Sequence, residues 1–338
     1  MSFAHVAELA DQLDLPQVKA PSLEGLMVTV PAPGDFTAEE VQQRFLELAR
    51  PHATERYRYP TERVAWRDEV LLSIAGYSNG RLLPFSIRKE EWLPVAPEPM
   101  LPGLYEALVG HLPTETVVVY LTLPTEYPVE SLRGTRARFV LQLHAAREVT
   151  YPDPDSPEFL RAFGRGATLL EAMRSVYQQL EHEQVQKLGL LAQQRVLAEV
   201  AARTQVKIPS ELIDREILQR WSASEGATVR ELDFSPEQQQ ESLQGWLRDA
   251  RTRSEVEQRL RIGLALGAIC RRDGLSLTPE RVGELLREQA DAAGVSLEEL
   301  VESLRAEPEN LARFDQMAWH LMAVDHVMSQ AQVRFVDA

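Results

Sequence analysis

Histidine, cysteine and carboxylate side chains are the residues of this chain that could support acid–base, nucleophilic or metal chemistry. The seven histidines are scattered along the sequence. His320 and His326 share one predicted helix, but six residues separate them, so they face different directions and cannot bind one ion together. His182 lies in the run EHE, which is typical of a solvated helix surface. The sequence contains no G-x-S-x-G, P-loop or G-x-G-x-x-G motif, so it predicts no metal, no cofactor and no assignable catalytic residue.

The single cysteine, Cys270, excludes an internal disulfide and a thiolate metal cluster. It lies in the apolar run LALGAIC, where a small buried core residue is the simplest interpretation. The first residues, MSFAHVAELADQ, have neither a positive start nor a long apolar stretch, so we expect no signal peptide. These observations favour a reducing, cytoplasmic setting.

The charge balance restricts the partners. Thirty-six lysines and arginines stand against 51 aspartates and glutamates, which gives a net charge of -15. Such a chain repels phosphate backbones, so nucleic acid is not an expected partner. No apolar run approaches the roughly 20 residues that a membrane span needs, so we expect no membrane insertion.

The elements that would position a site fall into two kinds of region, one rich in strands and one mainly helical. Between residues 63 and 148, DEVLLSIAGYSNG, TVVVYLTL and ARFVLQLHA read as strands, and Asn79-Gly80 is a strong hairpin signal. The segment LPGLYEALVG between them reads as a short helix. Several strands around one short helix predict a compact α+β domain.

The remainder reads as mainly helical. A strand at GLMVTVP precedes a helix that starts at Thr37 and ends near Arg50, with Thr37 and Glu40 placed as a capping box. After the linker YPDPDSP, helices are predicted up to residue 203, from Ser210, over one tract at 235–276 and from Thr278. Pattern alone leaves open whether these helices pack as a bundle or project as arms. The last helix carries Met317, Leu321, Met322, Val324 and Met328.

Prolyl isomerisation is one chemistry that needs no nucleophile and no metal. A dry, aromatic-lined cleft can hold a twisted amide and lower its rotation barrier of about 18–20 kcal/mol. The order VLLSIAGYSNG, LPGLYEALVGH, LTLPTEY, SLRG and ARFVLQL resembles the FKBP-type prolyl-isomerase domain of the trigger factor family of bacterial ribosome-associated chaperones. The residues that match the family pattern are Gly76, Gly80, Pro102, Gly103, Gly110, His111, Pro124, Glu126, Tyr127, Leu132, Gly134 and Phe139.

The resemblance continues on both sides, because LEGLMVTVPAPGDFTAEEV is similar to the family's linker and KIPSELIDREI to its helical substrate-binding domain. It implies an α+β multidomain protein, with an FKBP-like antiparallel sheet and an all-helical C-terminal domain with projecting arms. The expected divisions are an amphipathic helix at 1–14, a linker at 15–60, the isomerase-like domain at 61–150 and the chaperone domain at 151–338.

The cleft departs from the family pattern. The resemblance assigns it Ile74, Leu83, Trp92, Leu101, Leu104, Leu123, Tyr127 and Phe139. Apolar side chains replace most of the family's aromatic ones, which keeps the core filled but removes the flat walls that hold a prolyl ring. We therefore expect weak or absent isomerase activity, with an active prolyl isomerase as the alternative.

The resemblance implies an ATP-independent chaperone that binds unfolded or nascent polypeptides through an apolar helical cradle. Met317, Leu321, Met322, Val324 and Met328 are its candidate residues, because methionine adapts to varied partners. A module dedicated to one partner is a further alternative. The family's N-terminal docking loop has no counterpart in the sequence, so ribosome docking is not expected. The apolar stripe Phe3, Val6, Leu9 and Leu13 would dock on the same molecule or on a second copy, which leaves a homodimer open.

Overall fold

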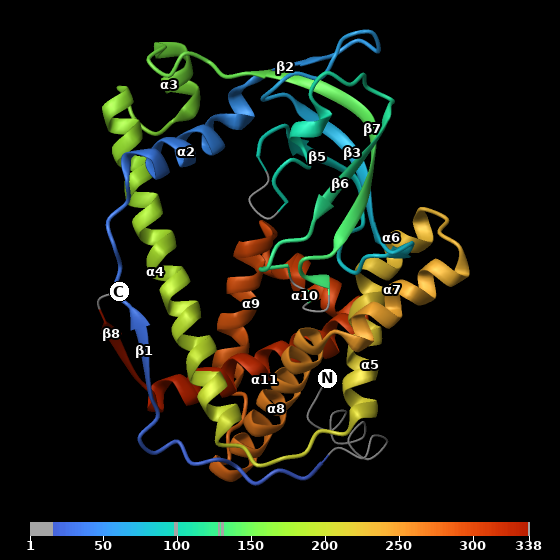
Figure 1. The fold of residues 1–338 in the computed structure, drawn as a ribbon. Helices are drawn as coiled ribbons and strands as arrows, with labels where there is room; N and C mark the ends of the chain where they lie inside the picture. The colour runs from blue at the N-terminus through green and yellow to red at the C-terminus, as the bar shows by residue number, and fades with distance from the viewer. Residues whose placement is uncertain (1–15, 98–100, 128, 130–131, 337–338) are drawn as a thin grey trace. The chain divides into compact units, whose positions relative to one another are not determined.

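The computed structural model describes residues 16–97, 101–127, 129 and 132–336 (Figure 1). The chain divides into two compact units. One contains the chain up to Gly34, Gln184–Pro209 and the chain from Glu257 onward, and the other contains Asp35–Glu183 and Ser210–Val256. The helix predicted at 1–14 lies outside the described residues.

The second unit contains an antiparallel sheet, and with its many helices the chain is α+β, as predicted. The hairpin at Asn79-Gly80 is confirmed, since Tyr77 pairs with Leu82 and Ser78 with Arg81 across it. The long strand β7 pairs with β2, β3 and β6, and β5 pairs with β3. The strands are β2 (Thr54–Tyr57), β3 (Glu69–Ser78), β4 (Arg81–Leu82), β5 (Arg88–Pro94), β6 (Thr116–Thr122) and β7 (Arg136–Thr150).

One face of this sheet is buried. Ala137, Phe139, Leu141 and Leu143 alternate with more exposed residues along β7, so each of them points to the same side. The predicted short helix is present as the 3₁₀ turn η2 (Glu106–Leu108), which contributes the fully buried Leu108 to this core. The sequence alternation therefore produces a sheet with a packed side and an open side.

Helices α2 (Ala38–Ala49) and α3 (Pro157–Phe163), the turn η1 (Arg50–His52) and the start of α4 (Leu169–Ala202) form a second core. The predicted capping box of α2 is confirmed, because Thr37 Oγ1 accepts from the Glu40 amide and the Glu40 carboxylate accepts from the Thr37 amide. Phe45 and Phe163 meet in an edge contact with centroids 5.1 Å apart.

The same unit includes α5 (Ser210–Ala223), α6 (Glu225–Glu231), α7 (Pro236–Arg248) and the first turns of α8 (Ala250–Asp273). The tract predicted at 235–276 is thus divided into two helices. Asp249 ends α7 and caps α8, since its carboxylate accepts from the Thr252 amide at 2.8 Å and from the Thr252 hydroxyl at 2.7 Å.

The other unit contains α9 (Pro279–Ala293), α10 (Leu297–Ala306), α11 (Pro308–Gln330) and a two-stranded parallel sheet. The predicted strand β1 (Met27–Pro31) is present, and it pairs with β8 (Gln332–Val336), which the sequence analysis did not predict (Figure 1). Thr278 caps α9, with Pro279 in its first turn, as predicted.

Candidate functional site

The predicted cleft residues form a filled core. Seven of the eight belong to one apolar cluster, in which Leu101 is partly buried and the other six are between 1% and 5% exposed. Packing is tight because a Cβ on Gly76 would lie 2.8 Å from Phe139 Cε1 and 3.0 Å from Leu83 Cδ1. These six buried side chains belong to the same apolar cluster. The members of this group are Ile74, Leu83, Leu101, Leu104, Leu123, Tyr127 and Phe139.

Trp92 is the predicted cleft residue that the structure places elsewhere. It pairs with Leu71 across β3 and β5, on the opposite face of the sheet from the apolar cluster. The Arg147 guanidinium lies 4.0 Å from its ring centroid, and Tyr57 makes an edge contact with it. Successive residues of a strand point to opposite faces, so the side chain of Trp92 lies on the face away from the apolar cluster.

The loop that follows β4 in the chain packs against helices α6 and α7. A Cβ on Gly245 of α7 would lie 2.3 Å from Pro84 Cγ, so the proline ring rests directly on the helix backbone. The Phe85 and Trp246 rings are 4.5 Å apart between centroids. Glycine on the helix is therefore required for this approach.

A buried carboxylate lies beneath the loop. Glu225, 7% exposed, accepts from the Phe85 amide at 2.6 Å, from Ser242 Oγ at 2.5 Å and from Trp246 Nε1 at 3.2 Å. Trp221 Nε1 donates to Ser242 Oγ at 2.8 Å. Burial raises the pKa of Glu225, while its three hydrogen bonds oppose that change. Sequence reasoning missed this group, because nothing in SASEGATVRE indicates that this glutamate is buried.

The same environment affects Tyr127. Burial, with a smaller contribution from the charge of Glu225, raises its pKa to about 12. Its hydroxyl donates a long hydrogen bond of 3.5 Å to the Pro84 carbonyl. Tyr127 therefore remains neutral near pH 7 and packs as a core aromatic.

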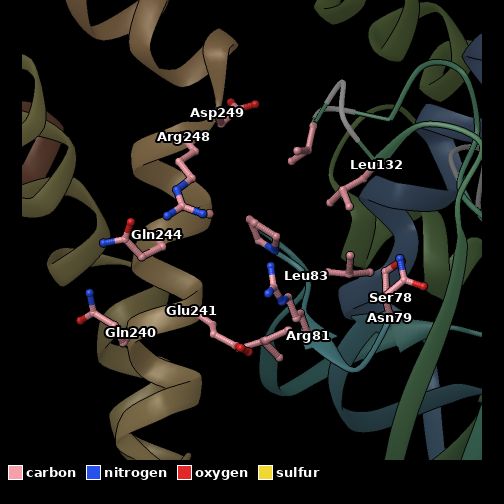
Figure 2. A pocket seen from close by; sticks show the side chains of 14 residues that line it. Ser78, Asn79, Arg81, Leu83, Leu132, Gln240, Glu241, Gln244, Arg248 and Asp249 are labelled. Carbon is pink, nitrogen blue, oxygen red and sulfur yellow. The ribbon is translucent and has the colours of Figure 1, made fainter.

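Beside this loop lies a groove of about 640 Å³, which we call the α7 groove. Its apolar wall contains Leu82, Leu83 and Leu132, whereas α7 supplies amide and charged side chains such as Gln240 and Gln244 (Figure 2). An extended peptide could place apolar side chains on one wall and its main-chain amides on the other. The lining residues are Ser78, Asn79, Arg81, Leu82, Leu83, Pro84, Val129, Leu132, Gln240, Glu241, Gln244, Gly245, Arg248 and Asp249.

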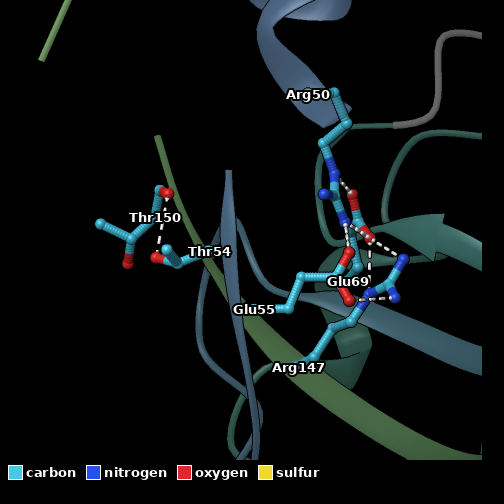
Figure 3. A network of polar contacts seen from close by, with 6 residues as sticks. All are labelled: Arg50, Thr54, Glu55, Glu69, Arg147 and Thr150. Atoms are coloured by element: carbon cyan, nitrogen blue, oxygen red, sulfur yellow. Dashed lines mark hydrogen bonds and ion pairs between the residues drawn. The ribbon is translucent and has the colours of Figure 1, made fainter. Parts of the chain in front are cut away.

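The most connected set of charges is structural. Arg50 and Arg147 converge on the Glu69 carboxylate at 2.6–2.9 Å, and both also pair with Glu55 (Figure 3). The hydrogen bond from Arg50 is the largest influence that lowers the pKa of Glu69. These pairs join β2, β3 and β7 to the end of α2.

A serine and a histidine also lie close together on the sheet. Ser73 Oγ lies 2.8 Å from His144 Nε2, yet no carboxylate contacts His144 among the described residues, so the arrangement lacks the third member of a triad. Among all the residues that the structure describes, no group of three or more His, Cys, Asp or Glu side chains could hold a metal ion. None of the described helices is both long and apolar enough to cross a membrane.

The predicted cradle residues of α11 are divided between two cores. Met317 and Leu321 pack with Leu285 and Phe314. Met322, Val324 and Met328 belong to the cluster around Val196 and Ile269, and Val324 is buried. Much of their apolar surface therefore contacts neighbouring elements of the same unit.

The family model and the two relatives described next are all of trigger factors. A family model described as "Bacterial trigger factor protein (TF) C-terminus" matches residues 168–322. The trigger factor of Pseudoalteromonas atlantica is 25% identical over 330 residues, covering 95% of this chain and 72% of that protein. The trigger factor of Shouchella clausii is 27% identical over 300 residues, covering 86% of this chain and 67% of that protein.

A solved structure, "Promiscuous Substrate Recognition in Folding and Assembly Activities of the Trigger Factor Chaperone", is 14% identical to this chain. The match covers 93% of this chain and 72% of that chain, with a TM-score of 0.33. A score this low does not establish a common overall arrangement.

Proposed function

Because the chain matches the trigger factor family, we propose that it is a chaperone that acts in protein folding by binding unfolded polypeptides without ATP. The relatives named above are trigger factors, and the sequence contains no nucleotide-binding P-loop. We also propose that the protein acts in the cytoplasm.

The observation that carries the proposal is the α7 groove, about 640 Å³ in volume, with an apolar wall and a polar wall. Leu132, which is only partly buried, would contact apolar side chains of a client, and Gln240 and Gln244 would hydrogen-bond to its main chain. Such contacts are weak and largely independent of client sequence, which suits a holding function.

We propose further that residues 61–150 form an FKBP-like domain that acts as a scaffold. The filling of the cleft by Leu83, Leu104 and Leu123, each at most 2% exposed, supports this role. A prolyl ring could enter only after several core side chains had moved, at a cost of several kcal/mol. A short X-Pro peptide should therefore isomerise at the uncatalysed rate in the presence of the protein. A rate well above background would favour the active isomerase instead.

Suppression of aggregation by a stoichiometric amount of the full chain tests the holding function. Gln240→Trp would fill the groove from α7 and should weaken suppression severalfold. The matched control is Gln194→Trp, which places the same ring at an exposed position of α4 outside the groove. Equal loss in both variants would exclude the groove as the client site, and no suppression by the unaltered chain would contradict the chaperone function itself.

A further inference from the structure

The open face of the sheet carries one arginine between two tyrosines and a second arginine two residues away. Arg138 of β7 pairs directly with Tyr120 of β6 on one side and with Tyr77 of β3 on the other. Its guanidinium lies 5.0 Å from the Tyr77 ring centroid. Arg136, two residues earlier on β7, points to the same face. We call this set the Arg–Tyr surface.

The Arg–Tyr surface is hollowed. A cavity of about 450 Å³ is lined by Tyr77, Asn79, Gly80, Tyr120, Arg136, Ala137 and Arg138. Tyr120 is 64% exposed, and Val118, two residues away on the same face of β6, is 46% exposed. A large aromatic side chain left this open on a sheet face is a feature of interaction surfaces.

The charge of this surface differs from that at the other end of the sheet. At the other end of the sheet, Arg50, Arg56 and Arg147 each bind two carboxylates. In contrast, neither Arg136 nor Arg138 forms an ion pair with any of the described residues, and the lining of the cavity contains no carboxylate. In a protein of net charge -15, these two guanidinium groups form a positive site that no carboxylate of the described residues neutralises.

We infer that the Arg–Tyr surface binds an extended, acidic segment of another polypeptide. Side chains two residues apart in a strand are about 6.4–6.8 Å apart. An extended segment with Glu or Asp at alternate positions therefore presents carboxylates at the spacing of Arg136 and Arg138. Tyr77 and Tyr120 would flank such a segment and exclude water from its carboxylate–guanidinium pairs.

Charge favours a polypeptide over a nucleic acid as the occupant. Only two arginines are available, so few phosphates could be neutralised, and the overall charge of -15 repels a polyanion. A short acidic segment places only two or three charges near the protein. The inference is independent of the chaperone proposal, because it predicts binding of a defined peptide class by Arg136 and Arg138, and neither arginine lines the α7 groove, although Asn79 lines both hollows.

Fluorescence anisotropy with a labelled seven-residue peptide that has glutamate at alternate positions tests the inference. The same peptide with glutamine, and one with lysine, serve as probes of charge. We expect the glutamate peptide to bind most tightly and its affinity to fall with added salt. Arg136→Gln together with Arg138→Gln should weaken it about tenfold, since two partly exposed ion pairs are lost. Tyr120→Ala should weaken it severalfold.

The control variant is Arg161→Gln with Arg174→Gln, which removes the same charge from exposed positions of α3 and α4. It should leave the affinity unchanged, and unfolding curves of both double variants should match that of the unaltered chain. Equal weakening by the control, or equal affinity for the glutamate and glutamine peptides, would overturn the inference. Tighter binding of a single-stranded oligonucleotide to the same arginines would overturn it as well.

Discussion

The contact between Pro84 and Gly245 allows a quantitative test of how the sheet joins α7. Replacing Gly245 by alanine adds a methyl group 2.3 Å from Pro84 Cγ and 3.2 Å from Pro84 Cβ. A proline ring cannot rotate away as a flexible side chain would, so the loop or the helix has to shift. Overpacking of this kind typically costs about 1–3 kcal/mol. Alanine also favours the helix by about 1 kcal/mol over glycine.

These opposing terms can be separated by comparison with Gly263. This glycine is exposed on α8, and an added Cβ meets nothing within 4 Å. Gly263→Ala should therefore gain the helix term alone, about 1 kcal/mol. Gly245→Ala should lower the free energy of unfolding by between zero and about 2 kcal/mol. The unfolding free energies of the two variants should therefore differ by about 1–3 kcal/mol.

Urea unfolding of the full chain, followed by circular dichroism, measures both changes. A third variant, Pro84→Ala, provides the decisive comparison, because it removes the ring that the new methyl group would strike. In the Pro84→Ala background, Gly245→Ala should stabilise the protein as Gly263→Ala does. If the effect of Gly245→Ala is the same with and without Pro84, the ring does not rest on α7 and the reasoning is refuted.

Three further perturbations have defined outcomes. Burial raises the pKa of Glu225 above its ordinary 4.5, so the folded chain favours the protonated form. Its stabilising contribution is complete below pH 4.5 and is lost as the pH rises through the raised value, so the unfolding free energy should fall toward neutral pH relative to that of Glu225→Gln; parallel curves would contradict this. Asp68→Ala breaks the buried pair with Arg58 and should cost about 3 kcal/mol in urea unfolding, whereas Glu62→Ala at an exposed pair should cost under about 1 kcal/mol. Phe139→Ala should cost about 3–5 kcal/mol in the same assay, and a loss below 1 kcal/mol would exclude a filled cleft.

The features that could be predicted from the sequence depend on neighbouring residues. Thr37 and Glu40 form their capping box within one turn, and Asn79-Gly80 forms a two-residue hairpin. In each case the residue types satisfy local backbone requirements regardless of the rest of the chain. The strand predicted at ARFVLQLHA is likewise present, as part of β7.

The features that were missed depend on distant residues. Strand β8 lies after a long helix and pairs with β1, whose residue Met27 is opposite Gln332. Glu225 is buried only because a loop from the sheet covers it. The family resemblance assigned Trp92 to the cleft, but the period of two along β5 places its side chain on the other face of the sheet.

The pairing of β1 with β8 bears on the order in which the protein folds during its synthesis. The unit that contains this pair is assembled from three stretches of chain and needs residues as far as Val336. The unit that contains the six-stranded sheet includes no residue after Val256. On a ribosome that adds about 5–20 residues per second, the roughly 80 residues from Glu257 to Val336 take about 4–16 s to synthesise. The unit with the six-stranded sheet can therefore fold while the partners of Met27–Pro31 are still being made, and β1 remains without its strand partner until Val336 has been added.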